Sequence, residues 1–339
     1  MNKKMVLLMA AAMLFGVLFA VSGRETVQVF AADKVARVDQ IWSDGSGRGP
    51  IIEDGELMTD IGYVWAEKQD NGRYYVYFSK ERDGKARYLF QTQPNVVPQE
   101  AIFVNDDVYF VQDSADKLKH YVYRVNLSGT RKQTRLFGFK SKTAAEASLI
   151  NYRNGKIYYY YGDEKTGSLY SYNVISKTKK GCKGNTLIED IFQQYIYLRE
   201  PGTDTIHIYD CSQNKVVRKI TTPSEYTYDR LHLQGVGDGF KIAICYKTPS
   251  YWDDKTKESA RVYLADLSGA NMQQYKDYIG EKVTLVDLYE KGVSFSVEET
   301  YNGRPLKPFY VFVMPDGKNS AFNTYSELRD WYETYKNEL

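Results

Sequence analysis

The sequence predicts an all-β protein, a single β-propeller of about six four-stranded antiparallel blades with a short C-terminal helix. The first observation behind this prediction is the abundance of tyrosine, with 31 tyrosines in 339 residues. The second is that aromatic-rich apolar runs recur in pairs, each pair joined by a polar hairpin. The third is that the second run of a pair closes on Asn or Asp, before turn residues such as Ser-Gly or Asp-Gly.

The second repeat shows the pattern best. Apolar runs at 101–104 and 108–111 flank Asp106 and Asp107, and further runs follow at 121–126 and 131–137. Short runs of alternating apolar and polar residues between turn signals are typical of β-strands. We therefore expect four strands joined by hairpins in each repeat.

The other repeats follow the same order. The expected strands lie at 62–66, 74–79 and 86–90 in the first repeat, with an innermost strand around 56–58; at 148–150, 157–161, 169–173 and 178–182 in the third; at 188–191, 195–198, 206–210 and 216–220 in the fourth; at 231–233, 240–246 and 261–266 in the fifth; and at 283–287, 293–297 and 309–314 in the sixth. The closing positions are Asn126, Asn173, Asp210, Asp266 and Asp316. Their spacing brackets the ~40–50 residues of a propeller blade.

A radial arrangement suits these sheets because each has two faces that need cover, which neighbouring blades supply. The propeller is expected over residues 33–321. The segment 35–42 is strand-like and lies outside the first repeat, so we expect it to pair with the last blade and close the ring. Two stacked β-sandwich domains are the alternative, but they do not explain why one sequence pattern recurs along the chain.

After the sixth repeat the apolar period changes from that of a strand to that of a helix. Thr324 and Glu327 have the spacing of a capping box, and Leu328, Trp331, Tyr332 and Tyr335 share one helical face. The segment 322–339 is therefore expected to be an amphipathic helix packed on the propeller. A helix that docks a partner is the alternative.

The N-terminus has the features of a secretory signal. Lys3 and Lys4 precede an uncharged apolar run from Met5 to Val21, and small residues at Ala31 and Ala32 suit a signal peptidase. We expect residues 1–31 to be a cleaved signal peptide and the protein to be secreted or at the cell surface. An uncleaved membrane anchor is the alternative; after cleavage no membrane insertion is expected.

Charge and cysteine content exclude several classes of protein. The chain has 45 basic and 43 acidic side chains, and removal of residues 1–31 leaves a net charge near zero. Such a balance gives no reason to expect nucleic acid as a partner. Cys182, Cys211 and Cys245 are odd in number, so at least one is a free thiol. A bridge between Cys182 and Cys211 is geometrically possible, and isolated thiols in strands are the alternative.

The repeats also carry a family resemblance. The paired phrases at 157–161 and 169–173 and at 108–111 and 121–126 resemble bacterial extracellular domains of unknown function that are similar to the YWTD-type propellers of lipoprotein receptors. The resemblance covers roughly residues 57–320 and rests on repeat style. No Tyr-Trp-Thr-Asp occurs, and Tyr109-Phe-Val-Gln112 stands in its place. The resemblance implies a secreted propeller and no particular activity.

No motif in the sequence predicts catalysis, a metal or a cofactor. His120, His207 and His232 lack the spacing of metal ligands, so no metal site is expected. His207 and His232 fall in strands and His120 at a hairpin, where we expect it to be solvated. The chain has no Gly-x-Ser-x-Gly, phosphate-binding loop or dinucleotide fingerprint. Acidic residues on innermost strands, Asp190 and Asp287 among them, keep open a glycoside hydrolase or lyase that acts at a central funnel.

Two loops are candidate contact surfaces. The hairpin 247–259 is the longest, and places Tyr251, Trp252, Asp253 and Asp254 at its tip. Aromatic rings beside acids suit sugar stacking or a protein hot spot, and packing back onto the propeller is the alternative. The segment 44–54 is rich in Gly and acids, but it lacks the spacing of a calcium loop, so a linker is favoured.

These observations favour a secreted, non-catalytic binding module that recognises an extracellular glycan or protein through a propeller face. It is expected to be a monomer without cofactors. The alternatives are the glycoside hydrolase or lyase, and an envelope accessory that docks through its terminal helix.

Overall fold

The computed structural model describes residues 35–38, 41, 43, 48–52, 60–98, 100–128, 132–140, 146–163, 165–249 and 257–339. Within these residues the chain forms antiparallel sheets and one helix near the C-terminus. The predicted fold class, an all-β propeller of four-stranded antiparallel blades with a short C-terminal helix, is confirmed, and the sheets are consistent with six blades.

The first three blades follow one another in the sequence. Blade one contains β2 (Gly49–Ile52), β3 (Asp60–Lys68), β4 (Tyr74–Ser79) and β5 (Arg87–Gln91). Blade two contains β6 (Ala101–Val104), β7 (Asp107–Asp113), β8 (Lys119–Asn126) and β9 (Thr134–Lys140), with β1 (Val35–Val38) added at its inner edge. Blade three contains β10 (Glu146–Arg153), β11 (Lys156–Gly162), β12 (Gly167–Asn173) and the first half of β13 (Lys179–Phe192).

The last three blades are built in the same way. Blade four contains the second half of β13 with β14 (Tyr195–Glu200), β15 (Thr205–Asp210) and β16 (Lys215–Ile220). Blade five contains β17 (Thr227–Val236), β18 (Gly239–Pro249) and β19 (Glu258–Asp266), with β20 (Gln273–Gln274) and β21 (Tyr278–Gly280) both paired to β19. Blade six contains β22 (Lys282–Leu288), β23 (Val293–Glu298), β26 (Phe309–Val313) and β27 (Asn319–Phe322). A small hairpin, β24 (Thr300–Tyr301) and β25 (Arg304–Pro305), separates β23 from β26.

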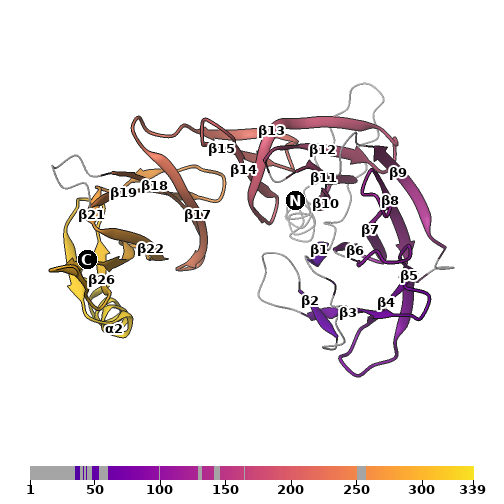
Figure 1. The fold of residues 1–339 in the computed structure, drawn as a ribbon, viewed down its shortest axis with the longest axis horizontal. Helices are drawn as coiled ribbons and strands as arrows, with labels where there is room; N and C mark the ends of the chain where they lie inside the picture. Colours follow the sequence, from indigo (N-terminus) through magenta and orange to yellow (C-terminus); the bar gives the residue numbers. More distant parts are fainter. Residues whose placement is uncertain are drawn as a thin grey trace, which may run out of the picture.

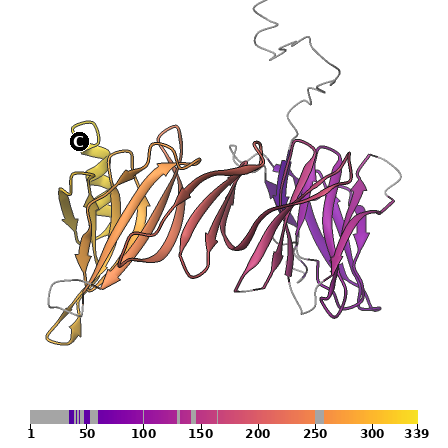
Figure 2. The ribbon, with the colours of Figure 1, turned by 90° about the horizontal axis from the view of Figure 1, so that it is seen from above.

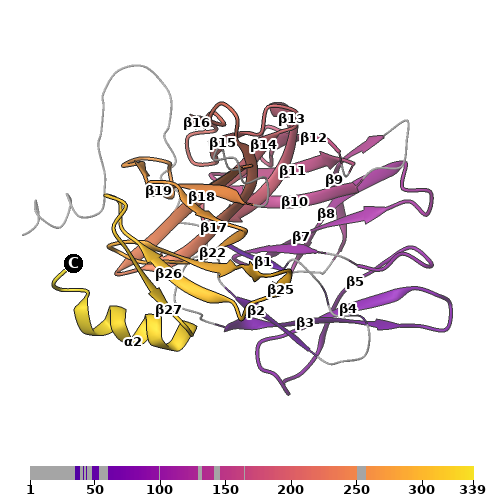
Figure 3. The ribbon, with the colours of Figure 1, turned by 60° about the vertical axis from the view of Figure 1, so that its left-hand side comes forward.

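The blades succeed one another in an open arc. In Figures 1 and 2, blades one and two lie at one end, blades five and six at the other, and the long strand β13 spans the middle. The turned view in Figure 3 shows the same order, with α2 (Tyr325–Tyr335) at the outer side of blade six. The contacts between elements run from each blade to the next, and none of the described strands of blade six makes an extensive contact with blade one.

The expected closing strand is placed differently. β1, from the segment 35–42, pairs antiparallel with β6 of blade two, with Val35 opposite Val104 and Val38 opposite Ala101. The expectation that this segment pairs with the last blade is therefore wrong. Ala36 and Val38 are buried in the layer between blades one and two, so burial there decides where the strand pairs.

The innermost strand of blade one also lies elsewhere than expected. Residues 56–58 are outside the described residues, and β2 at 49–52 supplies a strand that pairs with β3. Part of the Gly-rich segment 44–54 is therefore strand, not linker.

Apolar layers between the blades hold the arc together. Five clusters of buried side chains lie in order between blades one and two, two and three, three and four, four and five, and five and six. They form because alternate residues of each strand point to opposite faces of the sheet and meet the neighbouring blade.

Two tyrosines fasten blades to their neighbours at equivalent positions. Tyr158 of β11 donates a hydrogen bond from its hydroxyl to the carbonyl of Cys211, which follows β15 of the next blade (2.7 Å). Tyr197 of β14 donates in the same way to Leu267, which follows β19 (2.9 Å). Each tyrosine is the third residue of the second strand of its blade, so the tyrosine-rich repeat has a structural reason.

The closing Asn and Asp residues shape the turns that follow. Side-chain oxygens of Asn126, Asn173, Asp210 and Asp316 each accept a hydrogen bond from the backbone N–H two residues later, at 2.7–3.1 Å. This is the Asx turn, in which the side chain substitutes for a backbone acceptor. Asp266 contacts Lys241 and Asn271 instead.

The helix α2 covers the outer face of blade six. Thr324 caps it by accepting from the N–H of Glu327 (3.2 Å), and the Glu327 carboxylate accepts from Asn323 (2.9 Å). Leu328 and Tyr332 are buried against Phe312, and Trp331 packs beside them. Its apolar face therefore completes the core of its own chain.

We expect Tyr158→Phe to lower the free energy of unfolding by about 1–3 kcal/mol, because the buried carbonyl of Cys211 loses its donor. Urea unfolding measures the change. Tyr301→Phe is the control, since Tyr301 is 68% exposed on β24 and should change stability by less than about 0.5 kcal/mol. Equal effects of the two substitutions would contradict this role for Tyr158.

Leu328→Ala should cost about 2–5 kcal/mol, because it opens a cavity between α2 and blade six. Thermal or urea unfolding provides the readout, with Asp330→Ala on the exposed side of the same helix as control. If both variants unfold like the unsubstituted protein, α2 does not stabilise blade six.

Candidate functional site

The inner edge of the arc carries a repeated β-bulge. The pairing of the innermost strand with the second strand shifts by one residue before Asn151, Asp190, Arg230 and Asp287 in blades three to six. Bulges of this kind re-aim side chains and are over-represented beside functional sites. Here they bring a polar residue to the same position of four successive blades.

Two of these four polar residues bind the local backbone. Asn151 and Asp190 each accept a hydrogen bond from the N–H of the next residue (2.7 Å), and the Asn151 amide also donates to the carbonyl of Gln193 in blade four (2.5 Å). They stabilise the bulge and the contact between blades three and four.

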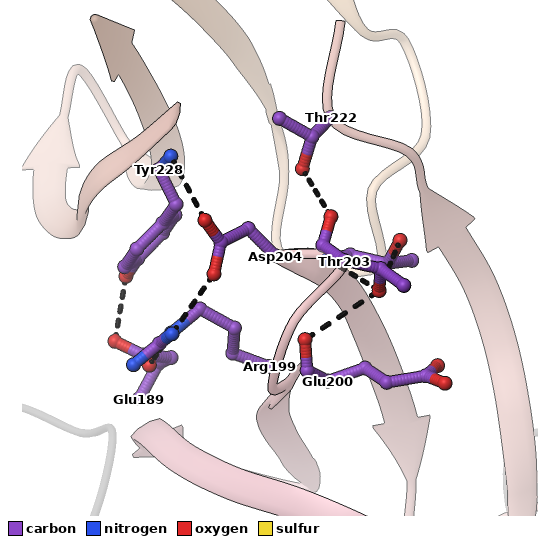
Figure 4. A network of polar contacts seen from close by, with 8 residues as sticks. Glu189, Arg199, Glu200, Thr203, Asp204, Thr222 and Tyr228 are labelled. Atoms are coloured by element: carbon purple, nitrogen blue, oxygen red, sulfur yellow. Dashed lines mark hydrogen bonds and ion pairs between the residues drawn. The ribbon is translucent and has the colours of Figure 1, made fainter. Parts of the chain in front are cut away.

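A larger polar network joins blades four and five (Figure 4). Arg199 donates to Glu189 (2.5 Å) and to Asp204 (3.0 Å), and Tyr228 of β17 donates to the other oxygen of Glu189 (2.6 Å). The Arg199 guanidinium also lies 5.0 Å from the ring centre of Tyr228. Because both carboxylates accept hydrogen bonds from the guanidinium and Glu189 also accepts one from Tyr228 of the next blade, the cluster holds blades four and five together.

A second network, in blade five, also joins an arginine, a carboxylate and a tyrosine. Arg261 donates to both carboxylate oxygens of Asp277 (2.7 and 3.0 Å), Tyr226 donates to the same carboxylate, and the guanidinium lies 4.3 Å from the Tyr226 ring centre. Burial opposes ionisation of Asp277, but hydrogen bonds from Arg261 and Tyr226 outweigh it and lower its pKa. This cluster too is satisfied within the chain.

A cavity between blade five, blade six and α2 differs from both networks. It has a volume of about 570 Å³ and is lined by residues 234–237, residues 287–291 and the side of the C-terminal segment 325–337 that faces them. Volumes of 300–1,000 Å³ are usual for ligand pockets. Three separate elements therefore enclose a space large enough for a small ligand or part of a larger one.

The cavity wall combines tyrosine rings with charges of both signs. The Tyr325 hydroxyl donates to the Asp287 carboxylate, and the Tyr289 ring lies 4.4 Å from the ring of Tyr332. Burial, and then the charge of Asp287, raises the pKa of Tyr289 to about 12. The Tyr289 hydroxyl is shielded from solvent and lies beside the Ser294 side chain, so the cavity presents the ring of Tyr289 and not its hydroxyl.

Two cations of the wall are unpaired. Arg329 and Lys291 form no ion pair within the described part of the chain, whereas Lys336 is paired with Glu333 (2.7 Å). Glu290 reaches the turn at Gly237, where φ is +60° and an added Cβ would meet the Glu290 carboxylate at 2.1 Å. The cavity thus offers donors, an acceptor and aromatic rings together, which is the set that polar organic ligands need.

Of the residues expected at a site, the structure brings only Asp287 into this cavity. Tyr251, Trp252, Asp253 and Asp254 lie outside the described residues. Asp190, on the innermost strand of blade four, does not line this cavity.

The histidines have structural partners. His207 contacts Glu200 (2.9 Å) and His232 contacts Gln234 (3.1 Å), both within strands. The expectation that His120 is solvated is wrong: its ring is fully buried in β8, stacks on Phe139 and contacts Asp113 (2.7 Å).

The cysteines and the acidic residues of the described chain form neither a disulfide nor a metal site. Cys182, Cys211 and Cys245 are free, although Cys182 and Cys211 pack in the same apolar layer. Across the described ranges, no three His, Cys, Asp or Glu side chains come together as a metal site would require. The helix of the described chain is too short and too polar to cross a bilayer.

Sequence reasoning missed most of the cavity. Tyr289, Glu290 and Lys291 occupy an ordinary turn, and Arg329 lies on the polar side of a helix, so none carries a linear signal. The change of period near residue 324 was the available clue, because a terminal helix must pack somewhere and creates a boundary where it does.

Comparisons with known proteins add little to this picture. No family model matches the chain, and no curated protein matches it. Similar solved structures include a prolyl endopeptidase, with 13% identity and a TM-score of 0.43. The match covers 84% of this chain but only 46% of the length of the endopeptidase.

Two other similar structures are propeller or propeller-related proteins. The β-propeller domain of the Trilobed protease from Pyrococcus furiosus is 11% identical, with 66% of this chain and 68% of that one covered (TM-score 0.35). The putative TolB from Agrobacterium tumefaciens is 12% identical, with 86% and 98% covered (TM-score 0.32). Likenesses this distant carry no conclusion about activity.

We expect the stability of the protein to fall as the pH rises from about 10 towards 12. Burial raises the pKa values of Tyr160, Tyr275 and Tyr289 to about 12. Tyrosines of the unfolded chain lose their protons near pH 10, so above that pH the native state holds more protons and deprotonation favours unfolding. Urea unfolding at pH 9, 10 and 11 tests the trend. Absorbance at 295 nm should show tyrosines that titrate only after unfolding, and uniform titration near pH 10 would contradict their burial.

Proposed function

We propose that this chain is a secreted, non-catalytic binding module that recognises an extracellular glycan or protein, with the cavity between blades five and six and α2 as its binding site. The observation that carries the proposal is the wall of this cavity, where two cations without an ion pair among the described residues, the Asp287 carboxylate and tyrosine rings converge from blade six and α2.

The two polar networks support a binding role indirectly. In both networks the arginine is paired with a carboxylate of the chain, as with Arg199 and Glu189. Arg329 and Lys291 form no ion pair with the described residues, and open hydrogen-bond capacity in a concave site is what a ligand with hydroxyl or carboxylate groups uses.

The terminal helix belongs to the same site. Its apolar side packs on blade six through Leu328 and Tyr332, and its polar side turns Arg329 and Lys336 towards the cavity. We therefore assign α2 a part in forming the binding site, in place of a separate docking function.

Binding is tested with a glycan array and with pull-down from extracellular extracts, followed by calorimetry on any ligand found. Arg329→Ala and Asp287→Asn should weaken binding roughly tenfold or more, since each removes a polar contact in a concave site. Arg304→Ala, an exposed arginine on β25, is the matched control. Ligands that bind all variants equally would exclude this cavity.

The same experiment addresses the hydrolase or lyase alternative. Release of new sugar ends from a bound glycan, lost in Asp287→Asn, would support an enzyme in place of a binding module. Absence of both binding and turnover would contradict the proposal.

A further inference from the structure

The outermost strands of blades two, three and four carry charges of one sign. These strands are β9, the first half of β13 (179–186) and β16, which follow one another along the outer edge of the arc (Figure 3). None of these three stretches contains Asp or Glu. Their basic residues, which we call the basic rim, are Arg135, Lys140, Lys179, Lys180, Lys183, Lys215, Arg218 and Lys219.

The chain does little to neutralise the basic rim. Among the described residues, Lys183 is the one member that forms an ion pair, with Glu200 at 3.6 Å. Lys140 stands directly opposite Lys119 across β8 and β9, although like charges in opposed positions repel each other. The chain without residues 1–31 is close to neutral as a whole, so the rim is a segregation of charge and not a sign of a basic protein.

Two cations of the rim lie close together where blade two meets blade three. Lys179 of β13 donates to the carbonyl of Gly138 in β9 (2.7 Å), and its ammonium lies 5.2 Å from the centre of the Phe137 ring. Partial burial, and then the charge of Arg135, lowers the pKa of Lys179. An anion bound beside Lys179 and Arg135 would relieve the repulsion between them.

A second pair of cations lies where blade three meets blade four. Lys219 is directly opposite His207 in the register of β15 and β16, and Lys183 contacts Glu200, which also holds His207 at 2.9 Å. Burial is the main cause that lowers the pKa of His207, and the charges of Lys183 and Lys219 lower it further. Successive blade junctions therefore each hold two cations of the rim.

A β-bulge in β13 places its lysines at both junctions. The pairing of β12 with β13 passes from Lys183 opposite Leu169 to Gly181 opposite Tyr170, so Cys182 is the extra residue. Without the bulge, Lys179 and Lys183 would point to the same face of the sheet, because strand side chains alternate. With it, Lys179 reaches blade two and Lys183 reaches blade four.

Protection of exposed sheet edges accounts for only part of this pattern. Charged side chains on an edge strand prevent another chain from adding to the sheet, and either sign of charge does so. The edge strands β20 and β27 of blades five and six carry Gln, Asn and Ser in place of charges. Edge protection therefore does not explain why charges of a single sign are gathered on blades two to four.

We propose that the basic rim binds an acidic polysaccharide, which runs along the outer edges of blades two, three and four. The need for negative charge follows from the rim, through charge complementarity. The choice of a polysaccharide rests on the proposed function as an extracellular module. The cavity beside α2 takes no part in this site.

The shape and composition of the rim favour a polysaccharide over other polyanions. β9 and β13 lie on the convex side of the arc, which a flexible polymer can follow and a flat membrane touches only locally (Figure 1). Proteins that bind single-stranded nucleic acid add aromatic rings on which bases stack. The aromatic residues of the three strands are engaged inside the protein, Phe137 in the layer between blades two and three and Phe139 against His120.

Calorimetry with the full-length mature chain tests the proposal. Dextran sulfate supplies sulfate groups, polygalacturonate supplies carboxylates, and uncharged dextran has the backbone of dextran sulfate without its charge. At least one acidic polysaccharide should bind, and its affinity should fall roughly tenfold or more between about 0.05 M and about 0.5 M salt, because salt screens the charges. Binding of neither acidic probe, or equal binding of dextran, would overturn the proposal.

Substitutions locate the site. Lys180→Gln combined with Lys219→Gln should weaken binding roughly tenfold, because two exposed charges of the rim are removed. Lys68→Gln combined with Lys307→Gln is the matched control, since it removes the same charge from exposed positions in blades one and six. Circular dichroism confirms that each variant is folded. Equal binding by the two double variants would exclude the rim.

Chemical footprinting gives a readout on the unsubstituted chain. Acetylation of lysines, followed by mass spectrometry, should be slowed by dextran sulfate at Lys180 and Lys219 and unchanged at Lys68 and Lys307. Uniform protection would contradict a site on the rim.

Two further outcomes separate this proposal from its competitors. Arg329→Ala should bind the acidic polysaccharide like the unsubstituted chain, so failure at the cavity and failure at the rim are distinguishable. Single-stranded DNA that binds more tightly than either acidic polysaccharide at equal charge would assign the rim to nucleic acid and overturn the proposal.

Discussion

The packing of one blade's face against the next is the interaction on which the structure depends. An antiparallel four-stranded sheet of this composition has apolar side chains on both faces, and neither face is stable in water alone. Five apolar layers between blades, and a sixth beneath α2, meet this requirement without a closed ring. Tyrosine suits these layers because its ring fills the space and its hydroxyl reaches a carbonyl of the next blade, as Tyr158 and Tyr197 show.

The same requirement explains where function can lie. Polar groups between blades must be satisfied to be buried, and the Arg199 and Arg261 networks are satisfied within the chain. The cavity beside α2 lies at one end of the arc, where the packing of blade on blade stops, and Arg329 there forms no ion pair with the described residues. This candidate site is a consequence of ending a stack of sheets.

The sequence predicted the fold well, because strands, turns and caps are local. The Asx turns after Asn126 and Asn173 and the capping box at Thr324 follow from neighbouring residues. The prediction that the segment 35–42 closes a ring by pairing with the last blade was wrong. The pairing of β1 is decided by its partners in β6, which are distant in the sequence and which no local pattern encodes. The cavity was missed for the same reason, since Tyr289 and Arg329 meet only through tertiary packing. His120 was misplaced because its burial depends on Phe139 of a neighbouring strand.

The open arc has a consequence for how such a chain changes over evolutionary time. In a closed ring the angle between blades fixes their number, and loss of one blade breaks the circle. In a linear array each unit contacts only its two neighbours, so stability is roughly a sum over units and their interfaces. Duplication or deletion of an internal unit by unequal recombination would then lengthen or shorten the array while keeping both ends. The shared strand β13 sets one restriction, because blades three and four can be gained or lost only as a pair.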